Sequence, residues 1–320
     1  MKECPEPIHI AFGVNNSYAS YIAVTIKSIM ENNPGCDIHV HVLTDRISKS
    51  NRARLEETVG GNGRVKLGIY VVDDSSLKGL RTGTWTIYTW YRVLLPEILP
   101  KEVKRVLYLD ADTLVVSDLR ELFSMDMTGK SIAAPLDIQS FSDWAFERCG
   151  YEREKKYVCA GVLLMNLEYW RRHETAKQLI DWADKNRDRI FYPDQDAVNY
   201  ICRDTKILLP FRYNIFKFYL TGDLHKVPEL FADIRDCAYN PAIVHYAGYY
   251  PWLRFFDTHP MQDEWERYNN MLLHPVGRTC LPKRWLHVKM ILWKLLHRPF
   301  EKQTRLTVED VKRRLTEYDS

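Results

Sequence analysis

The sequence predicts an α/β domain built around a mostly parallel β-sheet, and three observations lead to this prediction. Short apolar runs typical of buried strands alternate along the chain with segments of helical period. The 320 residues are 46% hydrophobic and 27% charged, enough for one large domain or two modest ones. A buried strand at 105–109 runs directly into two aspartates, Asp110 and Asp112. Ligands of parallel sheets bind beyond the carboxyl ends of the strands, so this pair marks a candidate site.

The expected elements follow in chain order. In the first predicted helix, Ile22, Ile26, Ile29 and Met30 share one face, and the Pro34-Gly35 pair ends it. The expected helices cover residues 18–33, 48–59, 89–99, 167–186 and 195–202. The expected strands cover residues 8–14, 37–45, 65–72, 105–109, 131–137, 161–166 and 242–248.

Composition excludes several classes of protein. A net charge of +3 is too small to indicate a nucleic-acid partner. The first residues hold no apolar run of signal-peptide length, and no stretch approaches the ~20 apolar residues of a spanning helix. The seven cysteines form no CxxC pair, which favours reduced thiols in a cytosolic protein. The 12% aromatic content suits either a large core or surfaces on which sugars stack.

The composition changes near residue 271, and we therefore expect a main domain over 1–270 and a basic amphipathic tail over 271–320. The stretch 281–305 mixes basic residues with Trp, Leu, Ile and Phe. On a helix, one face would carry Trp285, Val288, Leu292 and Leu295, away from Lys283, Lys289 and Lys294. Such a helix is typical of an anchor on an anionic membrane surface. A C-terminal helix packed on the domain core is the alternative.

The spacing of Asp110 and Asp112 fits a metal site. Residues two apart in an extended chain point to the same side, so both carboxylates can approach one cation. Oxygen ligands favour Mg²⁺ or Mn²⁺, which usually share their coordination sphere with substrate phosphates. A second D-x-D at 194–196 shows that the pattern alone is weak. His245, at the end of another apolar strand, could complete the site and would favour Mn²⁺ over Mg²⁺, although a single strand-end histidine is more often structural.

Five blocks occur in an order that is typical of one enzyme family. They are FGVNNSYASYIAVTIKSI, YRVLLPEILP with KRVLYLDADTLV, AGVLLMNLEYWRR, DQDAVN and HYAGYYPW. From residue 8 to about 260 the chain resembles glycosyltransferase family 8, the retaining galactosyl- and glucosyltransferases of bacterial surface glycans, with glycogenin a distant member. The resemblance implies that the main domain is a single GT-A, Rossmann-like domain that binds a nucleotide sugar.

The resemblance also implies roles for individual residues. Asp110, Asp112 and His245 would hold Mn²⁺, with Mg²⁺ as the alternative, and Ala111 would lie between the two carboxylates at the UDP-sugar. The nucleotide and donor-sugar side would include Asn15 and Tyr18 at the uracil, Arg92 at the ribose and donor sugar, and Ala160, Asp137, Asp194 and Gln195 along the sugar. Gln195 would lie beneath the anomeric carbon. Gly248 would let backbone amides approach the phosphates.

Two departures from the family pattern concern the donor site. Cys159 stands before Ala160 where the family usually has Asn, a better hydrogen-bond partner for sugar hydroxyls. The last block lacks the Lys that usually precedes Pro-Trp, and the loop is one residue shorter. Arg254 is the candidate to neutralise the leaving diphosphate in its place.

The implied reaction is hexose transfer with retention from UDP-glucose or UDP-galactose to an oligosaccharide or lipid-linked acceptor, in surface polysaccharide or lipopolysaccharide synthesis. The divalent ion would stabilise the leaving diphosphate. Retention resembles front-face attack, or a covalent step for which Asp194 or Asp196 would be the carboxylate. Asp194 could instead cap the helix that follows it. The tail implies a cytoplasmic enzyme on the inner face of the membrane. A nucleotidyltransferase and a non-catalytic nucleotide-sugar-binding protein remain alternatives.

Overall fold

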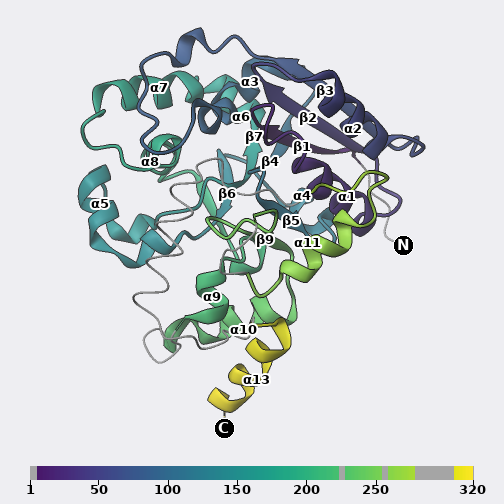
Figure 1. Ribbon diagram of the computed structural model, residues 1–320. Helices are drawn as coiled ribbons and strands as arrows, with labels where there is room; N and C mark the ends of the chain where they lie inside the picture. The colour runs from purple at the N-terminus through teal and green to yellow at the C-terminus, as the bar shows by residue number, and fades with distance from the viewer. Residues whose placement is uncertain (1–5, 223–227, 254–258, 278–305, 320) are drawn as a thin grey trace, which may run out of the picture.

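The centre of the molecule is a seven-stranded sheet, seen in a computed structural model that describes residues 6–222, 228–253, 259–277 and 306–319 (Figure 1). Its strand order is β3-β2-β1-β4-β7-β6-β8. The strands are β1 (Ile8–Gly13), β2 (Ile38–Thr44), β3 (Val65–Val71), β4 (Arg105–Leu109), β6 (Ile132–Pro135), β7 (Val162–Asn166) and β8 (Lys206–Leu209). All neighbours pair in parallel except β7, which is antiparallel to both β4 and β6. The predicted mostly parallel α/β sheet is confirmed.

Alternating side chains bury both faces of this sheet. On β4, Leu107 and Leu109 join one hydrophobic cluster, whereas Val106 and Tyr108 join the cluster on the opposite face. The first face is covered by α1 (Ile22–Asn32) and α2 (Lys49–Val59). The second is covered by the 3-10 helix η2 (Ile87–Leu94), α3 (Leu95–Ile98), α6 (Leu167–Arg172), α7 (Thr175–Lys185) and α8 (Pro193–Ile201). Near-continuous apolar strands such as β4 are typical of sheets buried on both sides.

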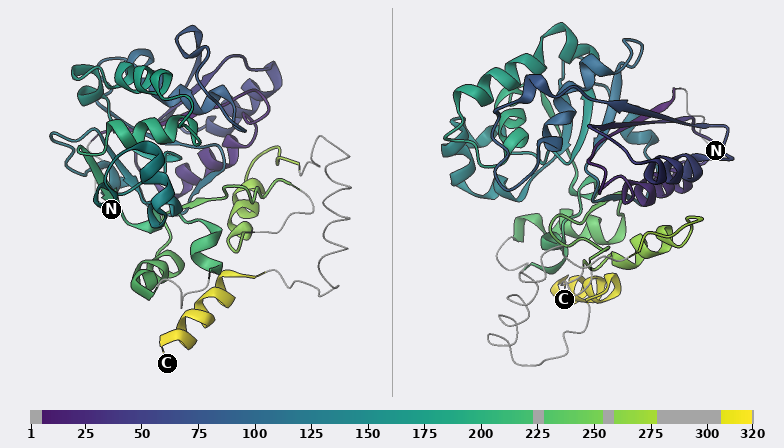
Figure 2. Two further views of the ribbon diagram at one scale, coloured as in Figure 1. Left: turned by 90° about the vertical axis from the view of Figure 1, so that its left-hand side faces the viewer. Right: turned by 45° about the horizontal axis from the view of Figure 1, so that its top comes forward.

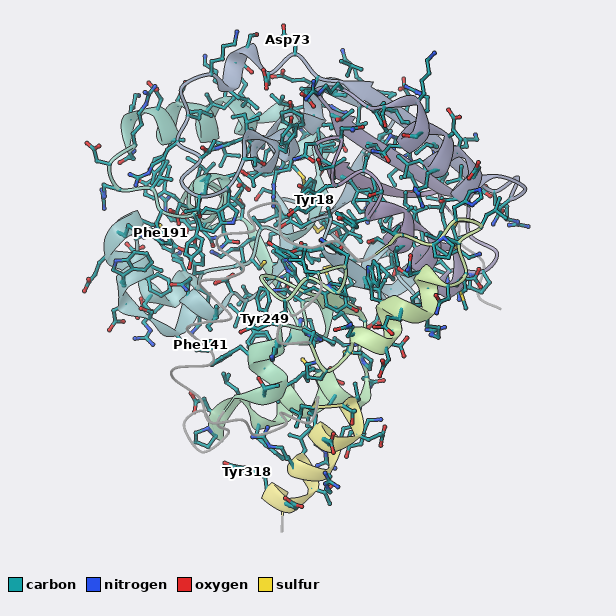
Figure 3. The ribbon with its side chains drawn as sticks, in the orientation of Figure 1. Tyr18, Asp73, Phe141, Phe191, Tyr249 and Tyr318 are labelled. Atoms are coloured by element: carbon teal, nitrogen blue, oxygen red, sulfur yellow. The ribbon has the colours of Figure 1, made fainter. Side chains whose placement is uncertain are left out.

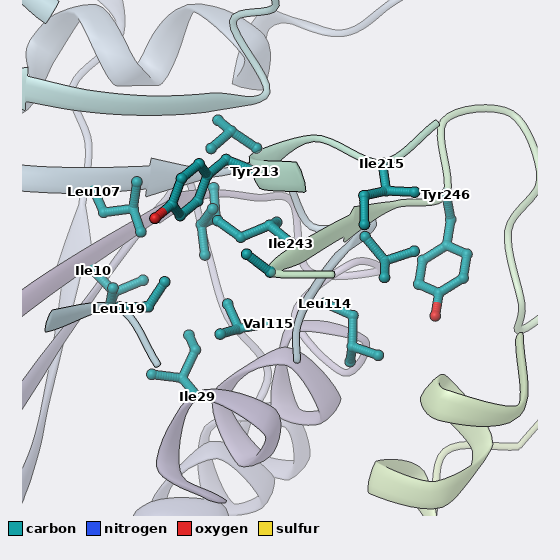
Figure 4. Packing of buried hydrophobic residues seen from close by; sticks show 14 of the residues in the cluster. Ile10, Ile29, Leu107, Leu114, Val115, Leu119, Tyr213, Ile215, Ile243 and Tyr246 are labelled. Atoms are coloured by element: carbon teal, nitrogen blue, oxygen red, sulfur yellow. The ribbon is translucent and has the colours of Figure 1, made fainter. Parts of the chain in front are cut away.

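A small second sheet lies below the carboxyl end of β4. It consists of β5 (Thr113–Val115) and β9 (Ile243–His245), paired antiparallel with Thr113 opposite His245. Figure 4 shows Leu114 and Val115 of β5 packed with Ile243 and, from α1, Ile29. This packing holds the segment after β8 against α1 and fixes the position of His245.

Helices after β8 form the lower part of the molecule (Figures 1 and 2). They include α9 (Lys217–Thr221), α10 (Phe231–Tyr239), α11 (Gln262–Asn269) and the C-terminal α13 (Val308–Asp319). Val311 and Leu315 of α13 are buried in the main hydrophobic cluster, and Tyr318 stacks on Phe231 of α10 at 4.7 Å between ring centres. The end of the chain is therefore a helix packed on the domain. The basic aromatic stretch 281–305 lies outside the described residues.

Several predicted boundaries were wrong, for identifiable reasons. Residues 89–99 divide into the end of the 3-10 helix η2 and the short α-helix α3, which has Pro96 in its first turn. Proline has no N–H and would clash with the preceding turn, so one continuous α-helix cannot run through it. The predicted helix 167–186 divides at Glu174, which has a φ of 49°. Within 242–248 only three residues form a strand, and that strand belongs to the small sheet.

Two findings concern features expected from composition. The five cysteines of the described part, Cys36, Cys149, Cys159, Cys202 and Cys237, are free and buried. Within the same residues, none of the helices combines the length and apolar character needed to span a bilayer.

Candidate active site

A cleft of about 590 Å³ opens at the carboxyl ends of β1 and β4. Its walls come from the loop after β1, the segment before η2, the turn after β4, the start of β7, α8 and the loop after β9. The predicted site residues among its lining are Asn15, Tyr18, Asp110, Ala111, Asp112, Asp137, Cys159, Gln195, His245 and Gly248. Residues far apart in the sequence thus meet at the edge of the sheet where ligands of such folds bind.

Asp110, Asp112 and His245 converge on one point of the cleft. One ligand atom from each lies within 4.8 Å of the others, and His245 Nε2 is 3.3 Å from Asp112 Oδ1. The small sheet brings this about, because Thr113 pairs with His245 and the backbone N–H of Tyr246 donates to the Asp112 carbonyl at 2.9 Å. The predicted metal-ligand group is therefore assembled in space.

The imidazole of His245 is oriented by Asn214. His245 is 5% exposed, and its Nδ1 lies 2.8 Å from the Asn214 Oδ1. An amide oxygen only accepts, so Nδ1 carries a proton, and Nε2 is the ring nitrogen that faces Asp112. A histidine held in this way by a second group is typical of metal ligands. No sequence pattern marks Asn214, because an asparagine in a loop is common.

The chemistry of this group fits a divalent ion. Two carboxylates and one neutral imidazole nitrogen are a donor set for Mn²⁺ or Mg²⁺. Burial alone would lower the pKa of His245, but the Asp112 carboxylate outweighs burial and raises that pKa. A positive charge between these side chains is thus favoured, and a bound cation would displace the proton.

The reversed direction of β7 brings its first residues to the metal-ligand group. The Asp110 N–H donates to the Gly161 carbonyl at 2.9 Å, just before β7 begins. A Cβ on Gly161 would lie 2.5 Å from His245 Cε1 and 2.7 Å from Asp110 Oδ2. Only glycine leaves room for both ligands here. Cys159 lies in the same segment, with its Sγ 3.9 Å from His245 Nδ1. The position at which this chain has Cys instead of the usual Asn is therefore next to the metal-ligand group.

Arg92 is buried behind the cleft and joins two predicted site carboxylates. Its side chain is 2% exposed, with Nη2 2.8 Å from Asp110 Oδ1 and Nε 2.9 Å from Asp194 Oδ2. The Nε–H itself points to the Thr89 carbonyl at 2.8 Å, and the guanidinium lies 4.1 Å from the centre of the Tyr108 ring. Arg92 thereby fixes the orientation of the Asp110 carboxylate. It lines a smaller cavity of about 70 Å³ together with Asp194, Gln195 and Ala160.

Gln195 and Asp137 lie side by side in the cleft. The Gln195 Oε1 accepts from the Ala160 N–H at 2.8 Å, and its Nε2 is 3.4 Å from Asp137 Oδ2. Asp137 also caps the short 3-10 helix η3 (Ile138–Phe141) by accepting from the Gln139 N–H at 2.8 Å. Burial raises the pKa of Asp137 to about 6. The amide of Gln195 is therefore held in one orientation by groups on both sides.

Asp194 is not the helix cap that the sequence also allowed. Helix α8 begins at Pro193 with Tyr192 in the capping position, because proline is favoured in the first turn. Asp194 therefore lies inside that turn, where it pairs with Arg92. Burial raises the pKa of Asp194 to about 6, although Arg92 acts in the opposite direction.

Asp196 is fully buried and saturated with partners. It accepts from the Tyr157 hydroxyl at 2.5 Å and from the backbone N–H groups of Phe191 and Tyr192 at 2.8 and 3.0 Å. It also pairs with the guanidinium of Arg148. A carboxylate with this many donors organises the surrounding chain and is a poor nucleophile.

Aromatic rings line the cleft beside the loop after β1, among them those of Tyr18 and Tyr250. Tyr18 lies edge-on to Trp252 at 6.0 Å between ring centres, and Trp252 stacks on Tyr250 at 5.2 Å. Asn15 accepts from the Tyr18 N–H at 2.9 Å and so fixes the loop after β1. Gly248 has a φ of 77° and nothing near its Cβ position, which leaves its backbone open to the cleft. Figure 3 shows Tyr18 near the middle of this view. Arg254 lies outside the described residues.

Comparisons with known proteins agree with this geometry. The family model described as "Glycosyl transferase family 8" matches residues 9–255. The lipopolysaccharide 1,2-glucosyltransferase of Escherichia coli is 25% identical over 253 residues, 77% of this chain and 74% of that protein. The lipopolysaccharide 1,3-galactosyltransferase of Salmonella typhimurium is 25% identical over 254 residues, 76% of this chain and 72% of that protein.

A solved structure has the same fold. The galactosyltransferase LgtC, crystallised with donor and acceptor sugar analogues, aligns with a TM-score of 0.74 and 28% sequence identity over 88% of this chain and 99% of its own. The α/β architecture is thus that of a GT-A glycosyltransferase. Because the family model matches residues 9–255, most of this chain, the chain belongs to glycosyl transferase family 8.

Proposed function

We propose that this glycosyltransferase moves a hexose with retention from UDP-glucose or UDP-galactose to a saccharide acceptor in bacterial surface-glycan synthesis. The observation that carries the proposal is the convergence of Asp110, Asp112 and His245 at the mouth of a nucleotide-sized cleft. The relatives named as lipopolysaccharide glucosyl- and galactosyltransferases support the donor and acceptor classes.

Asp110, Asp112 and His245 would hold Mn²⁺, which supplies a Lewis acid for the leaving diphosphate. Arg92 holds Asp110 in position through its Nη2 contact of 2.8 Å. Asn214 holds the His245 ring with its Nε2 toward the site, where it would bind the cation in place of a proton. Tyr18 and Asn15 also line the cleft, and the uracil would lie against them.

Gln195 and Asp137 would border the donor sugar. The Gln195 amide is fixed by the Ala160 N–H, so its remaining hydrogen-bonding capacity is presented to the sugar without loss of rotamer entropy. Asp196 is engaged by Arg148 and Tyr157, and Asp194 is held in an ion pair by Arg92, in which the Asp194 Oδ2 itself accepts no hydrogen bond. We therefore favour front-face attack over a covalent intermediate for the retention of configuration.

Of the two alternative functions, family membership argues against the nucleotidyltransferase. The non-catalytic alternative predicts no turnover. The test is to incubate the protein with UDP-glucose, UDP-galactose and the corresponding N-acetyl sugars in the presence of Mn²⁺. Release of UDP supports the proposal and identifies the donor. A nucleotidyltransferase would instead release no UDP and would convert the UDP-sugar to UTP and sugar 1-phosphate only when pyrophosphate is added. No product in either assay supports the non-catalytic alternative.

We further propose that the basic stretch 281–305 attaches the enzyme to the cytoplasmic face of an anionic membrane, where a lipid-linked acceptor would lie. Its sequence supports this, since each basic residue near such a surface contributes about 1 kcal/mol. Deleting the whole tail would also remove α13, whose Val311 and Leu315 are buried. Replacing Lys289 and Lys294 by Glu is the cleaner test. Binding to phosphatidylglycerol vesicles should fall, and binding equal to that of the parent would refute the anchor.

A further inference from the structure

Three large aromatic side chains lie exposed beside the cleft. Trp85 is 40% exposed, Trp144 is 42% exposed and Phe191 is 46% exposed. The Phe191 ring lies edge-to-face with Trp144 at 5.1 Å and with Trp85 at 6.1 Å between centres, so the three rings form one contiguous cluster. We name this cluster the aromatic ledge. Figure 3 shows Phe191 at the outer margin of the molecule, beside α5 (Asp143–Cys149).

The aromatic ledge is continuous with the candidate active site. Trp85 lines the main cleft together with Asp110 and Gln195, and it also lines the smaller cavity that contains Asp194. Trp144 lies farther out, at the start of α5. A ligand extending from the cleft past Gln195 would therefore run along Trp85 toward Phe191 and Trp144.

The guanidinium of Arg148, which is largely buried, packs against the rings of the aromatic ledge. The Arg148 side chain is 9% exposed, and its guanidinium carbon lies 4.3 Å from the centre of the Trp144 ring and 5.9 Å from that of Phe191. Its Nε and Nη2 atoms are buried without a hydrogen-bond partner. Such burial is costly, and cation–π contacts with the rings offset part of the cost.

Asp196 connects Arg148 to α8, the helix that carries Gln195. It pairs with Arg148 through Oδ2, and the same oxygen accepts from the Phe191 N–H at 2.8 Å. Asp196 follows Gln195 directly on α8. The second D-x-D of the sequence therefore fixes the position of the ledge relative to Gln195.

We infer that the aromatic ledge binds the saccharide acceptor by stacking its sugar rings on Trp144 and Phe191. Aromatic faces carry negative charge density that attracts the C–H groups on the face of a pyranose ring. An exposed apolar surface that adjoins a polar cleft is typical of a ligand site. The inference rests on the proposed function and adds the residues that select the acceptor.

The test compares Trp144→Ala and Phe191→Ala with Tyr239→Ala, a control that removes an aromatic side chain of similar exposure, 49%, from α10. Each protein is assayed for UDP release without acceptor and for hexose transfer to lactose, cellobiose and maltose. Binding of the same saccharides without donor is measured by calorimetry. The first two variants should lower the ratio of transfer to hydrolysis and weaken saccharide binding about two- to tenfold, the loss expected for one stacking contact. The control should match the parent.

The measurements separate this inference from the proposed function. A parent protein that releases no UDP from any UDP-sugar would contradict the proposed function, whereas saccharide binding that depends on Trp144 and Phe191 would still support the ledge. A parent that hydrolyses donor but binds none of the saccharides would overturn the ledge. Variants that transfer and bind as well as the parent would overturn it as well.

Discussion

His245 donates a hydrogen bond from its Nδ1 to the Asn214 Oδ1 at 2.8 Å, and this contact directs its Nε2 toward Asp112. Asn214 is fully buried, so water does not replace it readily when it is removed. Replacing Asn214 by Ala should weaken Mn²⁺ binding about 10- to 100-fold, the range observed for groups that orient metal-ligating histidines. The affinity is measured by calorimetric titration of Mn²⁺.

Asn214→Asp provides the matched comparison, because a carboxylate oxygen also accepts from Nδ1. It should restore most of the Mn²⁺ affinity that Asn214→Ala loses. A merely structural role for Asn214 would lower the melting temperature without this difference in affinity. Equal Mn²⁺ binding by Asn214→Ala and the parent would contradict the orientation argument.

Gly161 leaves the space that two metal ligands occupy. In Gly161→Ala the new Cβ would lie 2.5 Å from His245 and 2.7 Å from Asp110, so one ligand must move. We expect Mn²⁺ binding to be lost and unfolding free energy to fall by about 1–3 kcal/mol, as for other overpacked sites. Gly63→Ala is the control, because no atom lies within 4 Å of its Cβ position. Both variants are compared by thermal unfolding and Mn²⁺ titration, and a Gly161→Ala protein with parental Mn²⁺ affinity would exclude the steric argument.

Besides Arg254, Lys217 is a candidate to replace the Lys that the family usually carries before Pro-Trp. The Lys217 Nζ lies 4.4 Å from the centre of the Tyr249 ring, in the loop after His245 where the family usually carries its Lys. If Lys217 faces the leaving diphosphate, Lys217→Ala should lower kcat for UDP-sugar turnover about tenfold or more and weaken UDP binding. Arg254→Ala tests the alternative in the same assay. If neither variant changes the affinity for UDP, the metal ion held by Asp110, Asp112 and His245 neutralises the diphosphate without help from either side chain.

Three histidines on β1 and β2 predict how stability depends on pH. The Nδ1 of His9 lies 2.9 Å from the His41 Nε2, and the His41 Nδ1 lies 3.1 Å from the Tyr70 hydroxyl. Burial, together with the charge of neighbouring histidines such as His39, lowers the pKa of His9 to about 4 and that of His41 to about 3. The unfolded chain therefore takes up protons near pH 6.5 that the folded protein does not bind, and stability falls as the pH drops from 6.5 toward 4.

His41→Gln should reduce this fall, because one of the buried neutral groups is removed. The raised pKa values of Asp137 and Asp194 act in the opposite direction, so the informative quantity is the difference between variant and parent. Urea unfolding midpoints between pH 7.5 and 5 measure it, with the exposed His173→Gln as control. Parallel curves for His41→Gln and the parent would show that the histidines do not contribute.

Six of the seven strands of the main sheet and the metal-ligand group could be predicted because their signals are local, whereas the short strand β8 was not predicted. β4 and β7 are largely apolar runs, β2 alternates apolar residues with histidines, and the two aspartates directly follow β4. The position of His245 at the end of an apolar run made it a candidate for the same site. The predicted metal ligands therefore converge, although the small sheet that joins them was not predicted. Strands of three residues, such as β5 and β9, are too short to show a periodicity.

Other features depend on contacts between distant segments and leave no trace in a single sequence. The break at Glu174 occurs without a glycine or proline, so no residue type announces it. Asn214 and Gly161 matter because of what lies against them in space. The partners of Asp196 come from three separate segments, and only the folded chain distinguishes it from a nucleophile.

The central claim is that Asp110, Asp112 and His245 hold the divalent ion that binds the diphosphate of a UDP-sugar. The most direct measurement is calorimetric titration of UDP into the protein with Mn²⁺ and with excess chelator. Asp112→Ala is the test variant, and Asp184→Ala, which removes an exposed carboxylate paired with Arg187, is the control. The account predicts UDP binding that requires Mn²⁺ in the parent and the control, and that is lost in a folded Asp112→Ala protein. UDP binding of equal strength in chelator, or in Asp112→Ala, would contradict it.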